Sequence, residues 1–546
     1  SGDGSVTVDG GGSSFSTAAT NGQNFLGTSG TGALTFSSGA TGSAPAGFLI
    51  GSAAGASGSL DVLSSAVLTT GPLDIADQGA SAVGFVTVLG TLTQSGTSTL
   101  AVGQAAASGG AAIINIGSDT TGGTFTTGSG LTTVNPTGEI NLNSGAFNLN
   151  GGLTVTGGSF IQAGGAFTWA PGQTMTIQSG GVVNIAGLSI LGLTLGSSGT
   201  LNVQSTASLT SGSLDVADSG AAGTGVINVV GAILTQRGSS TLTVGQAAAF
   251  GGAATVTIGT AGIFTTGTGA TTIGATGIIN LTAGAFNANG NITVTGGSFT
   301  QTGGAFTWAG SQTMTIQSGG IVTLAGLYVT PTNAVINISG PGSKLENTGT
   351  SAIRILNGAT VSVTSGGTLQ ADSFLNIGFG TLTIDGLGSS FTTAVPVSSG
   401  ENVIGNGGHT STLTFSGQAT GSITNGFLLG VTPGSSGTLN VNSSASLTSG
   451  PLDLAASGAA GIGVVNVVGG TLTQSGSATL TVGQAAAAGG AATVTIGAAG
   501  IFTTGTGATT IGATGTLNLQ AGGTLNVNGN VTNAGSITLA GTQNWD

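Results

Sequence analysis

The sequence predicts an all-β protein, folded as a single long parallel β-helix (β-solenoid) with three short strands in each coil. Short stretches in which apolar and polar residues alternate recur along the chain, as expected of strands with one buried face. The pattern restarts after roughly 20 to 27 residues, a period typical of solenoids. Lys, Arg, Asp and Glu make up only 3% of the chain, so the strong surface helix formers are nearly missing.

The stretch from Val226 to Gly326 shows the pattern most clearly. It contains VINVVG, ATVTIG, IINLTAG, SFTQTGG and IVTLAG, with further short alternations between them. Ile227 and Val229 should face inward and Asn228 outward, because successive side chains of a strand point to opposite faces. One coil cannot bury its apolar face alone, so stability must come from stacking coil on coil.

The composition excludes several classes of function. Fifteen acidic residues against three basic ones give a net charge of −12, which leaves no cationic surface for nucleic acid or anionic lipid. Every apolar run is shorter than the roughly 18 residues that a membrane span needs. Without cysteine there is neither a disulfide framework nor a cysteine metal site. The chain starts at Ser1 without a leader pattern, which we interpret as a mature or cut start.

Three long copies can be aligned within residues 1–546. The motif TLTQSGTSTLAVGQAAA at Thr91 recurs twice, which places Gln104, Gln246 and Gln484 at equivalent positions. We predict one continuous solenoid with internal repeats over residues 1–187, 188–329 and 376–546 and a divergent insert over 330–375. At about 23 or 24 residues per coil the chain would make roughly 23 coils, stacked about 4.8 Å apart.

Six coils are predicted between the first copy and the second. They are expected to start with FVTVLG at Phe85, AIINIG at Ala112, EINLNSG at Glu139, SFIQAGG at Ser159, VVNIAG at Val182 and TLNVQS at Thr200, before VINVVG at Val226 begins the next round.

The divergent insert keeps the alternation in VINISG, IRILNG and VSVTSG, so we place it inside the solenoid. It holds two of the three basic residues, Lys344 and Arg354, with Glu346 nearby. A surface ion pair among them would contribute at most about 1 kcal/mol.

After the insert the opening of the chain is repeated. GTLTIDGLGSSFTT at Gly380 matches GSVTVDGGGSSFST at Gly4. Together with ISGPGSKLENTGT, LTFSSGATG and LTFSGQATG, these strings resemble the repeats of bacterial autotransporter passengers and related large secreted surface proteins. The resemblance implies a right-handed parallel β-helix and a location outside the cell or on the bacterial cell surface.

The best candidates for a ligand site are carboxylates in a repeated motif. Asp74 and Asp77 in PLDIAD correspond to Asp215 and Asp218 in SLDVAD. Each pair is a weak candidate for calcium, because two carboxylates fall short of the six or more oxygens that calcium takes. A solvated or corner-capping role is the competing interpretation. Elsewhere acidic residues are scattered, so we expect no catalytic site and no cofactor.

Other side chains that could carry chemistry have simpler explanations. His409 is the only histidine, and GNGGHTSTL offers it no partner for a metal or a nucleophile, so we expect a loop histidine. Trp169 and Trp308 lie in two AFTWA copies. They could form an outward platform for sugar rings, but polar Thr168 and Thr307 favour aromatic side chains that point into the core beside Phe147 and Phe160.

These observations predict a non-enzymatic, extracellular structural protein. Both ends read like interior coils, so we expect terminal coils with exposed strand edges that associate with a second copy, head to tail, into a filament or matrix fibre. The stalk of a cell-surface adhesin and a β-helix that binds or cleaves surface polysaccharide are the alternatives. Outward Thr-x-Thr triplets leave an ice-binding surface as a minor option.

Overall fold

The structure is a computed structural model that describes residues 2–18, 22–77, 80–104, 110–186, 188–191, 198–217, 223–246, 252–329, 332–393, 401–455, 461–484 and 489–546. In this part of the chain every helix or strand is a β-strand, from β1 to β66, as predicted. None of the described segments is therefore a helix that could cross a membrane. The chain divides into two compact units: unit 1 (1–271, 276–289 and 303–307) and unit 2 (272–275, 290–302 and 308–546).

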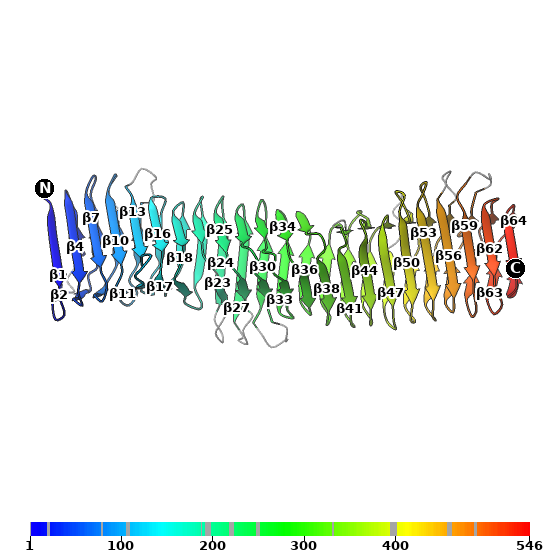
Figure 1. Cartoon of the computed structure of the whole chain (residues 1–546), viewed down its shortest axis with the longest axis horizontal. Helices are drawn as coiled ribbons and strands as arrows, with labels where there is room; N and C mark the ends of the chain where they lie inside the picture. Colours follow the sequence, from blue (N-terminus) through cyan, green and yellow to red (C-terminus); the bar gives the residue numbers. More distant parts are fainter. Residues whose placement is uncertain are drawn as a thin grey trace. The chain divides into compact units, whose positions relative to one another are not determined.

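In unit 1 most strands pair in parallel with the strands three places before and after them in the chain. β4 (Thr31–Ser37), for example, pairs with β1 (Gly4–Asp9) and β7 (Ser57–Val62), and the three lie side by side in Figure 1. A period of three strands is the coil of a parallel β-solenoid. This first sheet continues through β10 (Val83–Val88), β13 (Ala112–Ile116), β16 (Gly138–Leu142), β19 (Ser159–Gln162), β22 (Val182–Asn184), β25 (Ser208–Ser211), β28 (Ile233–Gln236), β31 (Ile263–Thr265) and β34 (Ala285–Ala288).

The remaining strands of unit 1 form the other faces of the coils. A second sheet contains β3 (Asn24–Leu26), β6 (Phe48–Ile50), β9 (Leu73–Ile75), β12 (Leu100–Val102), β15 (Thr132–Val134), β18 (Leu153–Thr156), β21 (Thr174–Gln178), β24 (Ser198–Gln204), β27 (Thr224–Val230), β30 (Ala254–Ile258) and β33 (Gly277–Leu281). The third face is formed first by β2 (Ser14–Ser16), β5 (Thr41–Ala44), β8 (Val67–Thr70), β11 (Thr91–Gln94), β14 (Gly123–Thr126), β17 (Gly145–Leu149) and β20 (Ala166–Trp169), and then by β23 (Leu188–Leu191), β26 (Leu214–Val216) and β29 (Leu242–Val244).

The predicted inward and outward directions are confirmed in β27. Ile227 and Val229 are fully buried in the core between the sheets. Asn228 faces outward, and its Nδ2 donates a hydrogen bond of 2.9 Å to Oδ1 of Asn202, its register partner on β24. Stacked amide side chains of this kind continue the coil-to-coil hydrogen bonding on the outer surface.

The predicted order of coil starts is wrong at its last steps. VVNIAG, in β22, pairs with β25 at Ser208 and not with TLNVQS. TLNVQS, in β24, pairs instead with TMTIQ of β21, in the second sheet. The reason is that the number of strands between equivalent positions of the two copies is not a multiple of three. Equivalent strands β10 and β27 therefore lie in different sheets of unit 1.

The coils also vary more in length than the predicted 20 to 27 residues. Register partners Asn148 and Thr168 are 20 residues apart, whereas Asp385 and Ser416 in unit 2 are 31 apart. The strands of the two coils are similar in length, so the difference lies in the segments that connect them.

A run of phenylalanines fills the core of unit 1 near β17. The ring of Phe147 lies 5.6 Å from those of Phe125 and Phe160 and 5.8 Å from that of Phe167, measured between centroids. Phe160 and Phe167 meet edge to face at 4.9 Å. The AFTWA residue Phe167 thus contacts Phe147 and Phe160, as predicted, but through tilted and edge-to-face pairs and not by stacking.

Sequence reasoning missed an inward polar residue in the TLTQ motif. Gln94 and Gln236 are buried, and each side chain donates hydrogen bonds to two backbone carbonyl oxygens of a corner. For Gln236 these are Thr241 O at 2.7 Å and Gly212 O at 3.2 Å. Thr241 O also accepts from the backbone N–H of Leu214 at 2.9 Å, so the amide adds a second hydrogen bond at this corner and joins it to the corner of the preceding coil.

Unit 2 repeats the same pairing rule. One of its sheets contains β40 (Tyr328–Val329), β43 (Ile353–Ile355), β46 (Leu375–Ile377), β49 (Asn402–Ile404), β52 (Phe427–Leu429), β55 (Leu452–Leu454), β58 (Leu480–Val482), β61 (Thr509–Ile511) and β64 (Val531–Asn533). The described residues of the divergent insert form coils of the same solenoid. Examples are β41 (Val335–Ser339), β42 (Lys344–Asn347) and β44 (Ala359–Thr364).

Candidate functional site

The predicted calcium candidates do not come together as one site. Asp74 lies in the second sheet of unit 1, on β9, and its Oδ2 accepts a hydrogen bond of 2.7 Å from Nε2 of Gln23. Burial raises the pKa of Asp77, and the charge of Asp74 raises it further. Asp215 lies on β26 in a different sheet, and Asp218 is outside the described residues. Among the described residues no three His, Cys, Asp or Glu side chains are grouped as a metal ion would need.

We expect calcium to leave the thermal stability of the protein unchanged. Asp74 is engaged by Gln23, and Asp77 adds one carboxyl group where calcium takes six or more oxygens. Thermal unfolding in calcium and in a chelator measures this. A calcium-dependent rise of the midpoint that disappears in Asp77→Asn would contradict the expectation.

A second acidic pair occupies the equivalent position in unit 2. Glu401 precedes β49 as Gln23 precedes β3, and Asp453 of β55 corresponds to Asp74. Where unit 1 has an amide that donates to a carboxylate, unit 2 has two carboxyl groups. The pKa of Glu401 is raised by its burial and then by the charge of Asp453.

We expect Glu401→Gln to stabilise the protein at neutral pH. A raised pKa means that the folded chain binds the proton more tightly than the unfolded chain, so this carboxyl lowers stability as the pH rises above about 4. The amide removes that loss and can donate to Asp453. The gain should be at most about 1 kcal/mol at pH 7, because the group is partly exposed, and should vanish near pH 4.

Thermal midpoints of both proteins at the two pH values measure this effect. Gln23→Glu is the matched control, since it creates the acidic pair in unit 1 and should destabilise the protein at pH 7. If the thermal midpoint of Glu401→Gln differed from that of the unchanged protein by the same amount at pH 7 and at pH 4, the effect would not come from the charge of Glu401.

Of the two AFTWA tryptophans, Trp169 lies in the core as predicted. Trp169 is only 8% exposed, and Phe167 on the same strand packs against Phe147 and Phe160. Thr168 faces outward between them, where its hydroxyl donates to Oδ1 of Asn148. Trp308 is half-buried. The AFTWA strand β20 therefore presents a polar outer face and not an aromatic platform.

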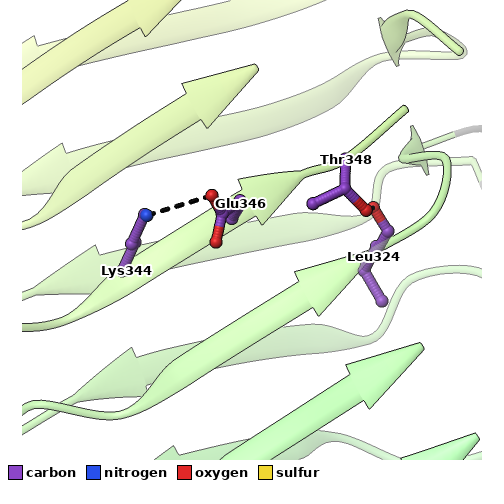
Figure 2. Close-up of polar contacts among 4 residues, drawn as sticks. All are labelled: Leu324, Lys344, Glu346 and Thr348. Atoms are coloured by element: carbon purple, nitrogen blue, oxygen red, sulfur yellow. Dashed lines mark hydrogen bonds and ion pairs between the residues drawn. The ribbon is translucent and has the colours of Figure 1, made fainter. Parts of the chain in front are cut away.

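The predicted ion pair of the divergent insert forms on β42. Nζ of Lys344 lies 3.2 Å from Oε1 of Glu346, two residues along the same outward face (Figure 2). Beyond the strand, the hydroxyl of Thr348 donates to the backbone oxygen of Leu324 on the preceding coil. Both charged side chains are partly exposed, so the pair is worth at most about 1 kcal/mol.

One hollow in unit 2 gathers side chains that are rare in this chain. It measures about 340 Å³ and opens at the corner that follows β43, β46 and β49. Arg354 and Asn376 are register partners on two of these strands, between inward isoleucines and leucines. Its lining residues are Arg354, Leu356, Asn357, Asn376, Gly378, Phe379, Asn406, Gly407 and His409.

Two aromatic side chains, Phe379 and His409, line this hollow. The rings of Phe379 and His409 are stacked, with centroids 4.6 Å apart and planes at 23°. Phe379 is 40% exposed and His409 is also exposed, so the pair faces solvent. His409 is thus in a corner loop, as predicted, but it has an aromatic neighbour that sequence reasoning missed.

The corners at the hollow are short. Residues 356–358, 378–379 and 405–409 connect the strands here. The sequence carried a signal for this place: Arg354 of the divergent insert and His409, the single histidine, are both of residue types that are rare in this chain. The three contributing corners are about one coil apart in sequence, so no local motif joins them.

Comparison with known proteins adds one structural likeness. No protein-family model matches the chain, and no curated protein matches it. A solved structure described as a TibC-catalysed hyper-glycosylated fragment of TibA, TibA55-350, aligns with a TM-score of 0.27 and 16% sequence identity. The alignment covers 84% of this chain and 99% of that one. The fold described above rests on the strand pairings of this chain itself.

Proposed function

We propose that the chain is a non-enzymatic structural protein that acts outside the cell or on the bacterial cell surface, as a fibre subunit or as the stalk of an adhesin. The observation that carries the proposal is the chemistry of the outward rows. In unit 1 one row runs through Thr35, Asp61, Thr87, Asn115 and Asn141, which are successive register partners.

Rows of this kind support a scaffold better than a catalyst. Nδ2 of Asn141 donates to Oδ1 of Asn115 at 3.1 Å, so outward amides bond along the stack instead of converging on a centre. Glycoside cleavage needs two carboxyl groups placed on either side of a bond. The mixture of Asn and Asp with Thr also interrupts the flat threonine array that an ice-binding surface would use.

Immunogold microscopy of the intact source cells tests the proposal. Label on the cell surface or on extracellular fibres is the expected result. Label confined to the cell interior would overturn it. Release of reducing ends from polysaccharides by the purified protein would overturn the non-enzymatic part.

Head-to-tail association stays a prediction within this proposal. In the described chain β1 is paired on one side by β4, and β66 (Thr542–Trp545) on one side by β63 (Thr524–Val527). The other edge of each strand could pair with a further coil, either of a longer chain or of a second molecule. Sedimentation velocity at micromolar concentration tests the second case: polymers are expected, and dispersed monomers would contradict it.

A glycan-binding role is the second candidate. The observation that favours it is the hollow beside Phe379 and His409, where aromatic, amide and guanidinium groups meet.

A further inference from the structure

We propose that the hollow beside Phe379 and His409 binds a carboxylated sugar, that is, a uronate residue of an acidic polysaccharide. The proposal names a ligand class for the glycan-binding candidate. The volume of about 340 Å³ lies at the lower end of the range of about 300 to 1,000 Å³ found for ligand pockets, which suits a single sugar ring.

The composition of the hollow departs from the rest of the chain. The protein has three Lys and Arg residues and one histidine in 546 residues, and Arg354 and His409 both line this hollow. Outward rows elsewhere carry mainly Thr, Ser and Asn, for example Thr35, Thr87 and Asn115. A chain with net charge −12 repels acidic polymers in general, so attraction to one requires a local cation.

The guanidinium selects the anionic group of the ligand. Arg354 is the middle residue of β43. Its neighbours in the strand, Ile353 and Ile355, are fully buried, so the backbone at Arg354 is fixed. A planar guanidinium binds a carboxylate through two parallel hydrogen bonds, a geometry that a lysine does not offer. A uronate carries its carboxylate on the sugar ring, close to the hydroxyl groups that identify a sugar.

The amides provide partners for sugar hydroxyl groups. Asn376 lines the hollow, and its Oδ1 is buried without a hydrogen-bond partner among the described residues, so this amide is an unsatisfied polar group within the lining. Oδ1 of Asn406 accepts from the backbone N–H of Gly407 at 2.8 Å, which leaves its NH₂ group to donate. A Cβ at Gly378 would lie 2.6 Å from Cδ2 of Leu356 and 3.6 Å from Oδ1 of Asn376, so this glycine keeps space beside the acceptor.

The stacked pair provides the apolar surface. Phe379 and His409 support each other at 4.6 Å, which holds both rings in place while they remain exposed. The C–H face of a sugar ring packs on such a flat aromatic surface, because the ring face is apolar and slightly negative. Guanidinium, amide and aromatic groups then contact three different parts of one ring.

The single histidine gives a direct readout of binding. With ¹⁵N-histidine labelling, the full chain gives the imidazole signals of His409 alone. We expect tri-galacturonate to shift these signals saturably at concentrations up to roughly 10 mM. Maltotriose, a neutral trisaccharide, and acetate, a bare carboxylate, should cause no saturable shift.

Variants assign the effect to the hollow. Isothermal titration should show binding of tri-galacturonate weakened about tenfold or more in Arg354→Gln and in Phe379→Ala, since each removes one of the contacts. Arg237→Gln and Phe85→Ala are the matched controls on unit 1, where both residues are exposed, and should bind like the unchanged protein. Thermal unfolding of each variant verifies that it is folded, and Arg354→Lys replaces Arg354→Gln if that variant does not fold.

Four results would overturn the proposal. These are no shift with tri-galacturonate, an equal shift with maltotriose, an equal shift with acetate, and an equal loss of binding in Arg237→Gln. The structural role would be untouched by any of them, because microscopy of the cells tests it separately.

Discussion

Val229→Asp is expected to lower the free energy of unfolding around β27 by about 3 to 5 kcal/mol, since it buries a charge without a partner. Val229 is fully buried, and its register partners on both sides, Val203 and Ile258, are apolar. The carboxylate would have no donor within the core. Because coils interact with their neighbours, the loss should be concentrated in adjacent coils and not spread over the chain.

Hydrogen exchange read out by mass spectrometry measures this effect coil by coil. Faster exchange is expected in β24, β27 and β30. Asn228→Asp is the matched control, with the same new charge one residue away on the outer face. It loses the hydrogen bond to Asn202, at a cost of about 1 kcal/mol. Equal effects of the two substitutions would contradict the assigned inward and outward faces.

Phe147→Ala is expected to cost about 3 to 5 kcal/mol, the range for removing a buried phenylalanine. Phe147 is fully buried, and its ring touches those of Phe125, Phe160 and Phe167. The substitution leaves a cavity and also removes aromatic pairs worth roughly 0.5 to 1.5 kcal/mol each beyond their burial.

Denaturant unfolding measures the change, followed by the fluorescence of Trp169 on the next coil in a protein whose other two tryptophans, Trp308 and Trp545, are replaced by phenylalanine. Phe85→Ala is the control, because Phe85 is 39% exposed on β10 and should cost under about 1 kcal/mol. If both substitutions lower the free energy of unfolding by the same amount, the buried phenylalanines do not stabilise this region in the way proposed.

Alternation predicted the direction of side chains but not the sheet in which a strand lies. Ile227, Asn228 and Val229 face as expected, since a period of two is a local property of a strand. Which strands pair depends on the number of strands and the length of corners between them. TLNVQS at Thr200 therefore moved to a different sheet from the one expected.

The sequence was less informative about the hollow in unit 2. Two of its residues, Arg354 and His409, could be singled out in the sequence because their residue types are rare in this chain. Their proximity depends on three corners that are short at the same place on successive coils, and alternation does not predict corner length. Alternation also did not predict the inward side chain of Gln236. Its hydrogen-bond partners, the corner residues Gly212 and Thr241, lie on either side of it in sequence.

Directed disulfide formation tests the in-register parallel pairing of the coils most directly. The chain has no cysteine, so two introduced cysteines can react only with each other within one molecule. Asn202 and Asn228 are register partners on β24 and β27, about 4.8 Å apart at the backbone. Asn202 and Val226 face the same way but are offset by two residues, at about 8 Å, beyond the reach of a disulfide.

The protein with Asn202→Cys and Asn228→Cys should oxidise to an intramolecular disulfide, and the protein with Asn202→Cys and Val226→Cys should keep both thiols free. Thiol counting by mass spectrometry distinguishes these outcomes. Free thiols in the first protein, or equal oxidation in both, would contradict the stacking on which the fold depends.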